Sequence, residues 1–125
     1  MVDWSAIVFP DDGMDFEEVN ANTVMAVSKR YSLNGAGSLD MTLPAQAPAN
    51  SRIEIISELT TNGFVIKQNA GQLIHFLNIT TTTGVGGSIT LLPSAGVLKG
   101  SITLVCLVDD LVWAAYPAGG NFDPV

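Results

Sequence analysis

The chain has 125 residues, a length that suits one domain with a modest core. Charged residues make up 14% of it and hydrophobic residues 47%, with a mean hydropathy of +0.36, so we expect part of its apolar surface to be buried between subunits. The net charge of −7 repels phosphate backbones and anionic lipids, which argues against nucleic acid as a partner.

Cysteine usage and hydropathy narrow the class of protein further. Cys106 is the only cysteine, which excludes an intrachain disulfide and a metal site built on several cysteines. No run approaches the ~20 apolar residues of a membrane span, and residues 1–10 lack the basic region of a signal peptide. We therefore expect no membrane insertion, and synthesis in a cytoplasm.

Residues 1–22 differ from the rest and are interpreted as a connecting segment ahead of a β-rich domain at 23–125. Within them, 4–9 favours a short strand, 10–13 a turn, and 15–18 a helical turn with acids near its positive end. The acids also raise the alternative of a calcium loop. Their spacing misses the D-x-D-x-D-G pattern of such loops, so we expect no metal and no cofactor.

From residue 23 onward, apolar residues alternate at the two-residue period of β-strands. The segment 23–33 alternates, a turn follows at 34–37, and 39–43 resumes the pattern, which predicts a hairpin. Further strands are expected at 52–57, 64–67, 73–76, 88–92, 101–108 and 111–116. About nine short strands with glycine-bearing turns and no convincing helix predict an all-β fold, a β-sandwich or jelly-roll-like domain of antiparallel strands.

The stretch 63–74 organises the rest of the chain. It has the pattern of a strand, a tight polar turn at 69–71 and a second strand. The amides of Gln68, Asn69 and Gln72 can both donate and accept hydrogen bonds, so a packed turn can use them to satisfy backbone groups. Nothing in this stretch is a nucleophile or a general base.

Several short motifs, in this order, resemble a β-rich module found at the C-terminal ends of phage and prophage tail fibres and of some bacterial collagen-like surface proteins. They cover the chain from about residue 23 to about residue 121 and include Met-Ala-Val at 25–27, Thr-Leu-Pro at 42–44, Arg-Ile-Glu-Ile at 52–55, Gly-Phe-x-Ile-x-Gln-Asn-Ala-Gly-Gln-x-Ile at 63–74, Leu-Val-Cys at 104–106 and Val-Trp at 112–113. The Gln-Asn-Ala-Gly-Gln element is the most specific of them.

This resemblance implies a homotrimeric tip that presents loops to a cell-surface receptor, often a glycan, on a virion appendage. A small-residue segment at 80–87, or the turn with Gln68, Asn69 and Gln72, is expected near a three-fold axis because small and amide side chains permit close approach of like chains. His75 is placed with this axis or turn group. The alternative is that three copies of His75 meet at the axis and supply three ligands to a metal.

Catalysis needs residues that the chain does not supply. His75 is the only histidine and is expected to be a partly buried strand residue. Cys106 lies between Val105 and Leu107, which predicts an inert core thiol. Asp109 and Asp110 are adjacent in a turn and point apart, whereas paired glycosidase acids face each other across a cleft. We therefore expect a protein that is not an enzyme.

The candidates for ligand binding are aromatic and polar residues of loops and strand ends. The aromatic candidates for stacking on a sugar ring are Trp4, Trp113 and Tyr116. Tyr116, before Pro117, is expected to be exposed, whereas Trp113 is expected in the core. The polar candidates are the loop residues Asn34, Asn62, Asn78, Asp109 and Asp110.

Two functions of different classes follow. The first is a non-enzymatic, trimeric fibre tip that binds a host-cell glycan or protein receptor, with three sites gaining avidity. The second is a structural trimerisation, decoration or cap module that binds only other virion or adhesin subunits.

Overall fold

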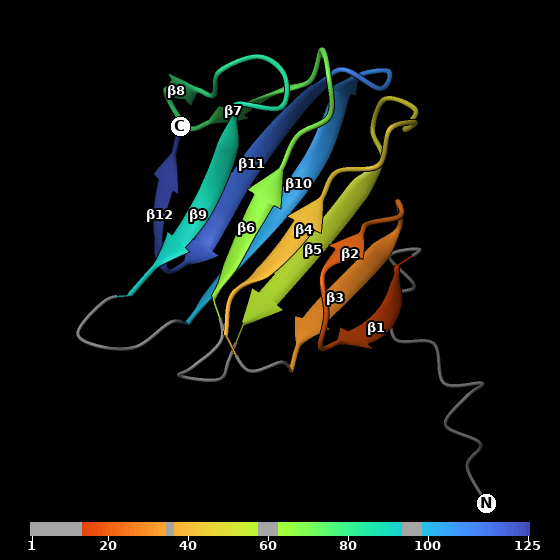
Figure 1. Cartoon of the computed structure of the whole chain (residues 1–125). Helices are drawn as coiled ribbons and strands as arrows, with labels where there is room; N and C mark the ends of the chain where they lie inside the picture. The colour runs from red at the N-terminus through yellow and green to blue at the C-terminus, as the bar shows by residue number, and fades with distance from the viewer. Residues whose placement is uncertain (1–13, 35–36, 58–62, 94–98) are drawn as a thin grey trace, which may run out of the picture.

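The computed structural model describes residues 14–34, 37–57, 63–93 and 99–125, which form two β-sheets packed face to face (Figure 1). The strands of these ranges are β1 Asp15–Val19, β2 Thr23–Val24, β3 Lys29–Leu33, β4 Leu39–Thr42, β5 Arg52–Ser57, β6 Phe64–Lys67, β7 Leu73–Phe76, β8 Ile79–Thr80, β9 Ser88–Leu92, β10 Gly100–Val108, β11 Val112–Gly119 and β12 Asn121–Pro124. No described residue is helical, and no helix able to cross a membrane occurs in these ranges. The expected all-β sandwich is confirmed.

Sheet A has seven strands in the order β1-β3-β5-β10-β11-β7-β8, and sheet B has five in the order β12-β9-β6-β4-β2. Both sheets are mixed. The pairs β1–β3, β3–β5, β11–β7, β2–β4 and β4–β6 are parallel, and the other five pairs are antiparallel. The expectation of an antiparallel, jelly-roll-like arrangement is therefore wrong for half of the pairings.

The parallel pairs arise because the chain changes sheet after each of the first six strands. β1, β3, β5 and β7 join sheet A, while β2, β4 and β6 join sheet B. The hairpin predicted over 23–43 does not form, since β3 and β4 lie in different sheets. The chain turns before β3 at Ser28, whose φ is +62°, and the Tyr31 hydroxyl accepts a hydrogen bond of 2.8 Å from the Ala26 amide.

The segment predicted as a helical turn at 15–18 is instead the edge strand β1, so this part of the connecting segment belongs to the sandwich. β1 pairs with β3 in parallel register. The Lys29 ammonium donates to the Glu17 carboxylate over 2.6 Å, and this hydrogen bond raises the pKa of Lys29. Side chains at alternate positions of a strand point to the same side, so Asp15 and Glu17 share one side of β1. Charged side chains of this kind are common on the edge strands of sheets.

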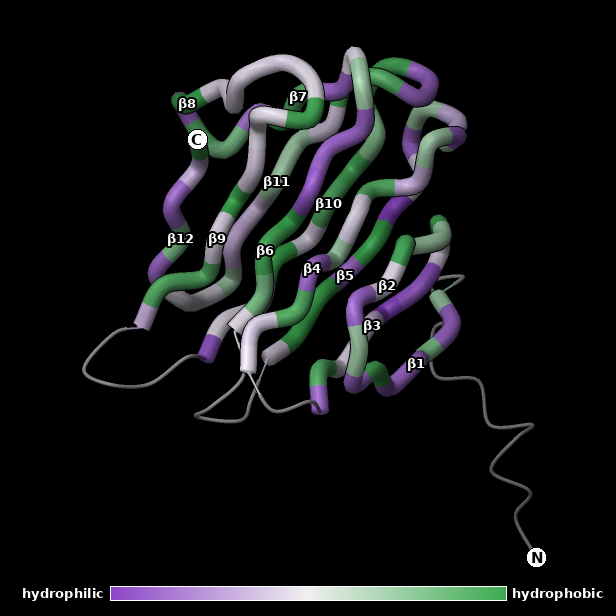
Figure 2. The backbone as a smooth tube through the Cα atoms, viewed as in Figure 1, coloured by the Kyte–Doolittle hydropathy of each residue, from purple (hydrophilic) through white to green (hydrophobic). Residues whose placement is uncertain are grey.

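The core lies between the sheets and follows the expected alternation, with apolar residues every second position (Figure 2). Its largest fully buried side chains include Trp113, Tyr31, Phe64, Met41 and Ile53. Trp113 and Cys106 are 0% exposed, which confirms both as core residues.

The expected terminal hairpin of β10 and β11 forms, with its turn at 109–111. The sequence did not indicate β12. Its Phe122 ring contacts the rings of Phe64 and Phe76 at centroid distances of 5.8 and 6.1 Å, so this last strand closes the core at one end.

Candidate functional site

The polar candidates from the sequence lie at separate places. The Asn34 amide nitrogen donates to the Glu18 carboxylate beside β1. Asp109 and Asp110 lie in the β10–β11 turn, where their Oδ1 atoms accept hydrogen bonds from the backbone amides of Ala49 (2.7 Å) and Ala47 (2.6 Å). These contacts hold the 45–50 loop against the turn. Asn78 is exposed in the β7–β8 turn, and Asn62 and Trp4 lie outside the described residues.

The three amides of the 63–74 stretch form a buried polar cluster where β6 leaves sheet B. The Gln68 amide nitrogen lies 2.7–2.9 Å from the carbonyl oxygens of Gln72, Thr82 and Gly84. The Gln68 amide oxygen accepts from the Thr81 hydroxyl. Gln68 is 4% exposed and Gln72 2% exposed, so each of these bonds replaces one to water that burial has removed.

Gln72 and Asn69 connect this cluster to two further loops. The Gln72 amide nitrogen donates to the Pro44 and Asp110 carbonyl oxygens, both at 2.9 Å, and its oxygen accepts from the Asn69 backbone amide. The Asn69 side chain donates to the Leu43 carbonyl oxygen over 2.8 Å. The cluster therefore ties together the ends of several strands and has no free polar group of these glutamines to offer a ligand.

The residues considered for catalysis do not form a reactive arrangement. Burial raises the pKa of the Cys106 thiol, which donates weakly to the Ala47 carbonyl oxygen. His75 is exposed, not partly buried as expected, because it points away from the core on edge-proximal β7, and its Nδ1 contacts the Thr80 hydroxyl at 2.9 Å. Within the described ranges no group of three histidine, cysteine or acidic side chains could hold a metal.

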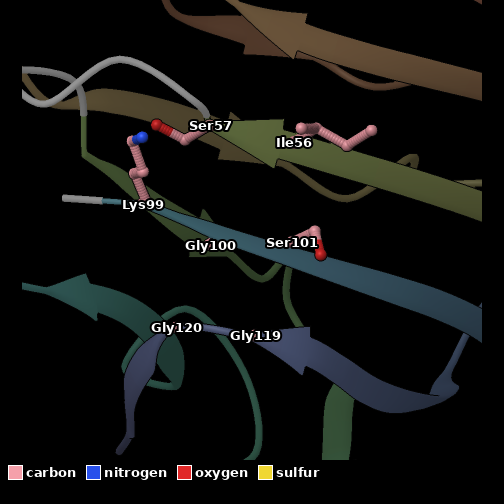
Figure 3. Close-up of a pocket in the computed structure, with 7 residues that line it drawn as sticks. All are labelled: Ile56, Ser57, Lys99, Gly100, Ser101, Gly119 and Gly120. Atoms are coloured by element: carbon pink, nitrogen blue, oxygen red, sulfur yellow. The ribbon is translucent and has the colours of Figure 1, made fainter.

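A surface groove on the outer face of sheet A is the most ligand-like feature. Its larger part, about 530 Å³, lies where β5, β10 and β11 run side by side (Figure 3). It is lined by Ile56, Ser57, Lys99, Gly100, Ser101, Gly119 and Gly120. The hollow exists because β11 has a glycine where a side chain would stand: a Cβ added at Gly119 would meet nothing within 4 Å.

The groove continues along the sheet into a smaller hollow of about 140 Å³, which shares Ile56 and Ser101 with the larger one. Thr103 and Glu54 line this second part. Thr103 pairs with Tyr116 across β10 and β11, and Tyr116 is 55% exposed, as expected. From Lys99 to Thr103 the four strand steps span roughly 14 Å at about 3.4 Å per residue. We call this feature, with Tyr116 at its far end, the sheet A groove.

The sheet A groove combines groups that suit a saccharide. Hydroxyls at Ser101 and Thr103 can donate and accept hydrogen bonds, the backbone is open at Gly119, and the exposed ring of Tyr116 offers an apolar face. Of the sequence candidates that the structure describes, only Tyr116 belongs to it. Ser101, Thr103 and Gly119 were not predicted from the sequence, because their proximity depends on which strands are neighbours, and residues 101 and 119 are far apart in the sequence.

Comparison with known protein families finds no family model that matches the chain, and comparison with curated proteins finds no similar sequence. The geometry of the sheet A groove and of the surface beside it is what points to a function.

Proposed function

We propose that this protein is a non-enzymatic, homotrimeric tip of a virion tail fibre that binds a glycan on the host-cell surface through the sheet A groove. The observation that carries the proposal is the groove itself: hydroxyl groups and an open glycine backbone beside one exposed tyrosine, on a rigid two-sheet scaffold. The resemblance of the sequence to tail-fibre tips supports the same conclusion.

The test is binding of the full chain to a glycan array, with Tyr116→Ala as the groove variant. Removing the ring should weaken binding roughly tenfold, since an aromatic contact is worth about 0.5–1.5 kcal/mol beyond area burial. Phe16→Ala is the matched control, because Phe16 is 67% exposed on β1 at the far edge of the same sheet. Equal affinities for the Tyr116 variant and the wild type would contradict the groove as the binding site.

The alternative function, a structural trimerisation or cap module, is favoured by a second observation on sheet A. The outward positions of β10, β11 and β7 carry no Asp, Glu, Lys or Arg. Leu73, Val105 and Val112 are half-buried there and lie side by side with Ala114, which is 4% exposed. We call these four residues the apolar patch. An apolar area of this kind on an acidic chain suits contact with further copies, and β10 shows the sequence pattern of a strand covered on both sides.

Both functions require a trimer, and the apolar patch supplies the variant that tests it. Light scattering of the wild type should give a mass near three chains at every concentration. Val112→Glu places a charge in the patch, between Val108 of β10 and Leu73 of β7. It should give a mass near one chain, because an unpaired carboxylate is costly to bury. Val65→Glu is the control, since Val65 is half-buried on the outer face of sheet B. A wild-type monomer, or a trimeric Val112→Glu variant, would contradict this assembly.

A further inference from the structure

The cations of the chain are unevenly placed, and three of the five lie around the sheet A groove. The chain holds only Lys29, Arg30, Arg52, Lys67 and Lys99 against twelve acids. Lys99 lines the larger hollow and is the one charged residue among its described lining residues. Arg30 and Arg52 both contact Glu54, which lines the smaller hollow.

Among the described residues of the groove, Lys99 supplies a positive charge that Glu54 does not match. Glu54 is 20% exposed and is paired with the two arginines, so its charge is already matched within the protein. Among the described residues of this face the other acid is Glu18, which is on β1 and is bound by the Asn34 amide, with β3 between β1 and β5. The described residues that line the hollow around Lys99 include no acid, and they supply hydroxyls and glycines. The described part of the groove is thus a positively charged region on the surface of a chain whose net charge is −7.

We propose that the ligand of the sheet A groove is an acidic saccharide, a glycan whose terminal sugar carries a carboxylate. The carboxylate pairs with the Lys99 ammonium, the sugar ring lies over the open backbone at Gly119 against Ser101, and the next sugar extends toward Thr103 and Tyr116. This inference rests on the proposed function and adds to it the charge and the orientation of the ligand.

The arrangement selects a single carboxylate over a polyanion. One lysine at one end of the groove matches one negative group, and the hydroxyl-lined remainder matches neutral sugar hydroxyls. A polymer with a charge on every unit would extend over a protein surface whose overall charge repels it. Discrimination therefore comes from one charged contact at a fixed end of the site.

The experiment uses the full chain on an array of matched glycan pairs, each with and without a terminal sialic, glucuronic or galacturonic acid. The same array is read with Lys99→Gln and with Lys67→Gln. Both variants remove one positive charge and change the net charge equally, but Lys67 is exposed on the outer face of sheet B. Solution affinities are then measured for the pair with the strongest signal, at low and at high salt.

We expect the carboxylated member of a pair to bind, and its affinity to fall roughly fivefold to tenfold in Lys99→Gln, as for loss of a partly exposed charged hydrogen bond. Lys67→Gln should bind like the wild type, and salt should weaken wild-type binding more than that of Lys99→Gln. Preference for the neutral members with sensitivity to Tyr116→Ala would overturn the carboxylate inference and leave the proposed function intact. Binding to no glycan at all would overturn both.

Discussion

Replacing Gly87 with alanine is expected to cost about 3 kcal/mol of the free energy of unfolding. A Cβ at this position would lie 2.5 Å from the Gln68 amide nitrogen and closer still to the Thr82 carbonyl oxygen. These two groups are hydrogen-bonded to each other, so the methyl group would have to separate them as well as find room. Overpacking costs about 1–3 kcal/mol, and a buried polar group left unpaired adds a similar amount. Urea unfolding measures the loss.

Gly86→Ala is the control for this variant. It makes the same chemical change one residue earlier, where the nearest heavy atom to the new Cβ, in the Thr82 side chain, is 4.0 Å away. Its free energy of unfolding should stay within about 0.5 kcal/mol of the wild type. If the two alanine variants proved equally stable, the close contact between Gly87 and Gln68 would not exist in the folded protein.

The second large effect is expected for Gln68→Leu, which should destabilise the protein by about 4 kcal/mol. Leucine has a similar size but cannot donate to the carbonyl oxygens of Gln72, Thr82 and Gly84 or accept from Thr81. Each buried group left without a partner costs about 1–3 kcal/mol. The Gln72 carbonyl oxygen and the Thr81 hydroxyl are both buried. Denaturant unfolding again gives the value.

Gln46→Leu makes the same replacement in the exposed part of the 45–50 loop, and its stability should change by less than about 0.5 kcal/mol. Hydrogen exchange separates a local from a global effect: in Gln68→Leu the amides of Gly84 and Gly87 should lose protection first, since they donate within the segment that Gln68 holds. Full stability of Gln68→Leu would show that the cluster is not needed to fold.

The alternation of apolar residues predicts most of the strands and their inward positions, but not which strands become neighbours. The patterns of 29–33 and 39–42 are those of a hairpin, and they are equally those of two strands in opposite sheets. A period of two fixes which side of a strand is buried and contains no information on the sheet that it joins. The parallel pairs of β3 with β5 and of β4 with β6 could not be predicted for that reason.

The same limit applies to the sheet A groove. Tyr116 could be identified because a tyrosine before a proline near a strand end is often exposed. Lys99, Ser101 and Gly119 gave no signal, because a serine and a glycine in strands are unremarkable until β10 and β11 place them opposite each other. A register shift between Ser101 and Ile102 also means that the partner of Ser101 on β11 cannot be found by counting residues from the turn.

In the described part of the chain the two sheets have four edge strands, and each discourages the addition of a further strand. β2 and β8 have only two residues each, β1 carries Asp15, Glu17 and Glu18, and β12 ends in Asp123 and Pro124. Short length, charge and a missing amide donor are the features by which β-proteins resist edge-to-edge aggregation. These edges therefore oppose open-ended fibril growth. The broad faces of the sandwich remain as the surfaces through which copies of the chain can form a closed oligomer.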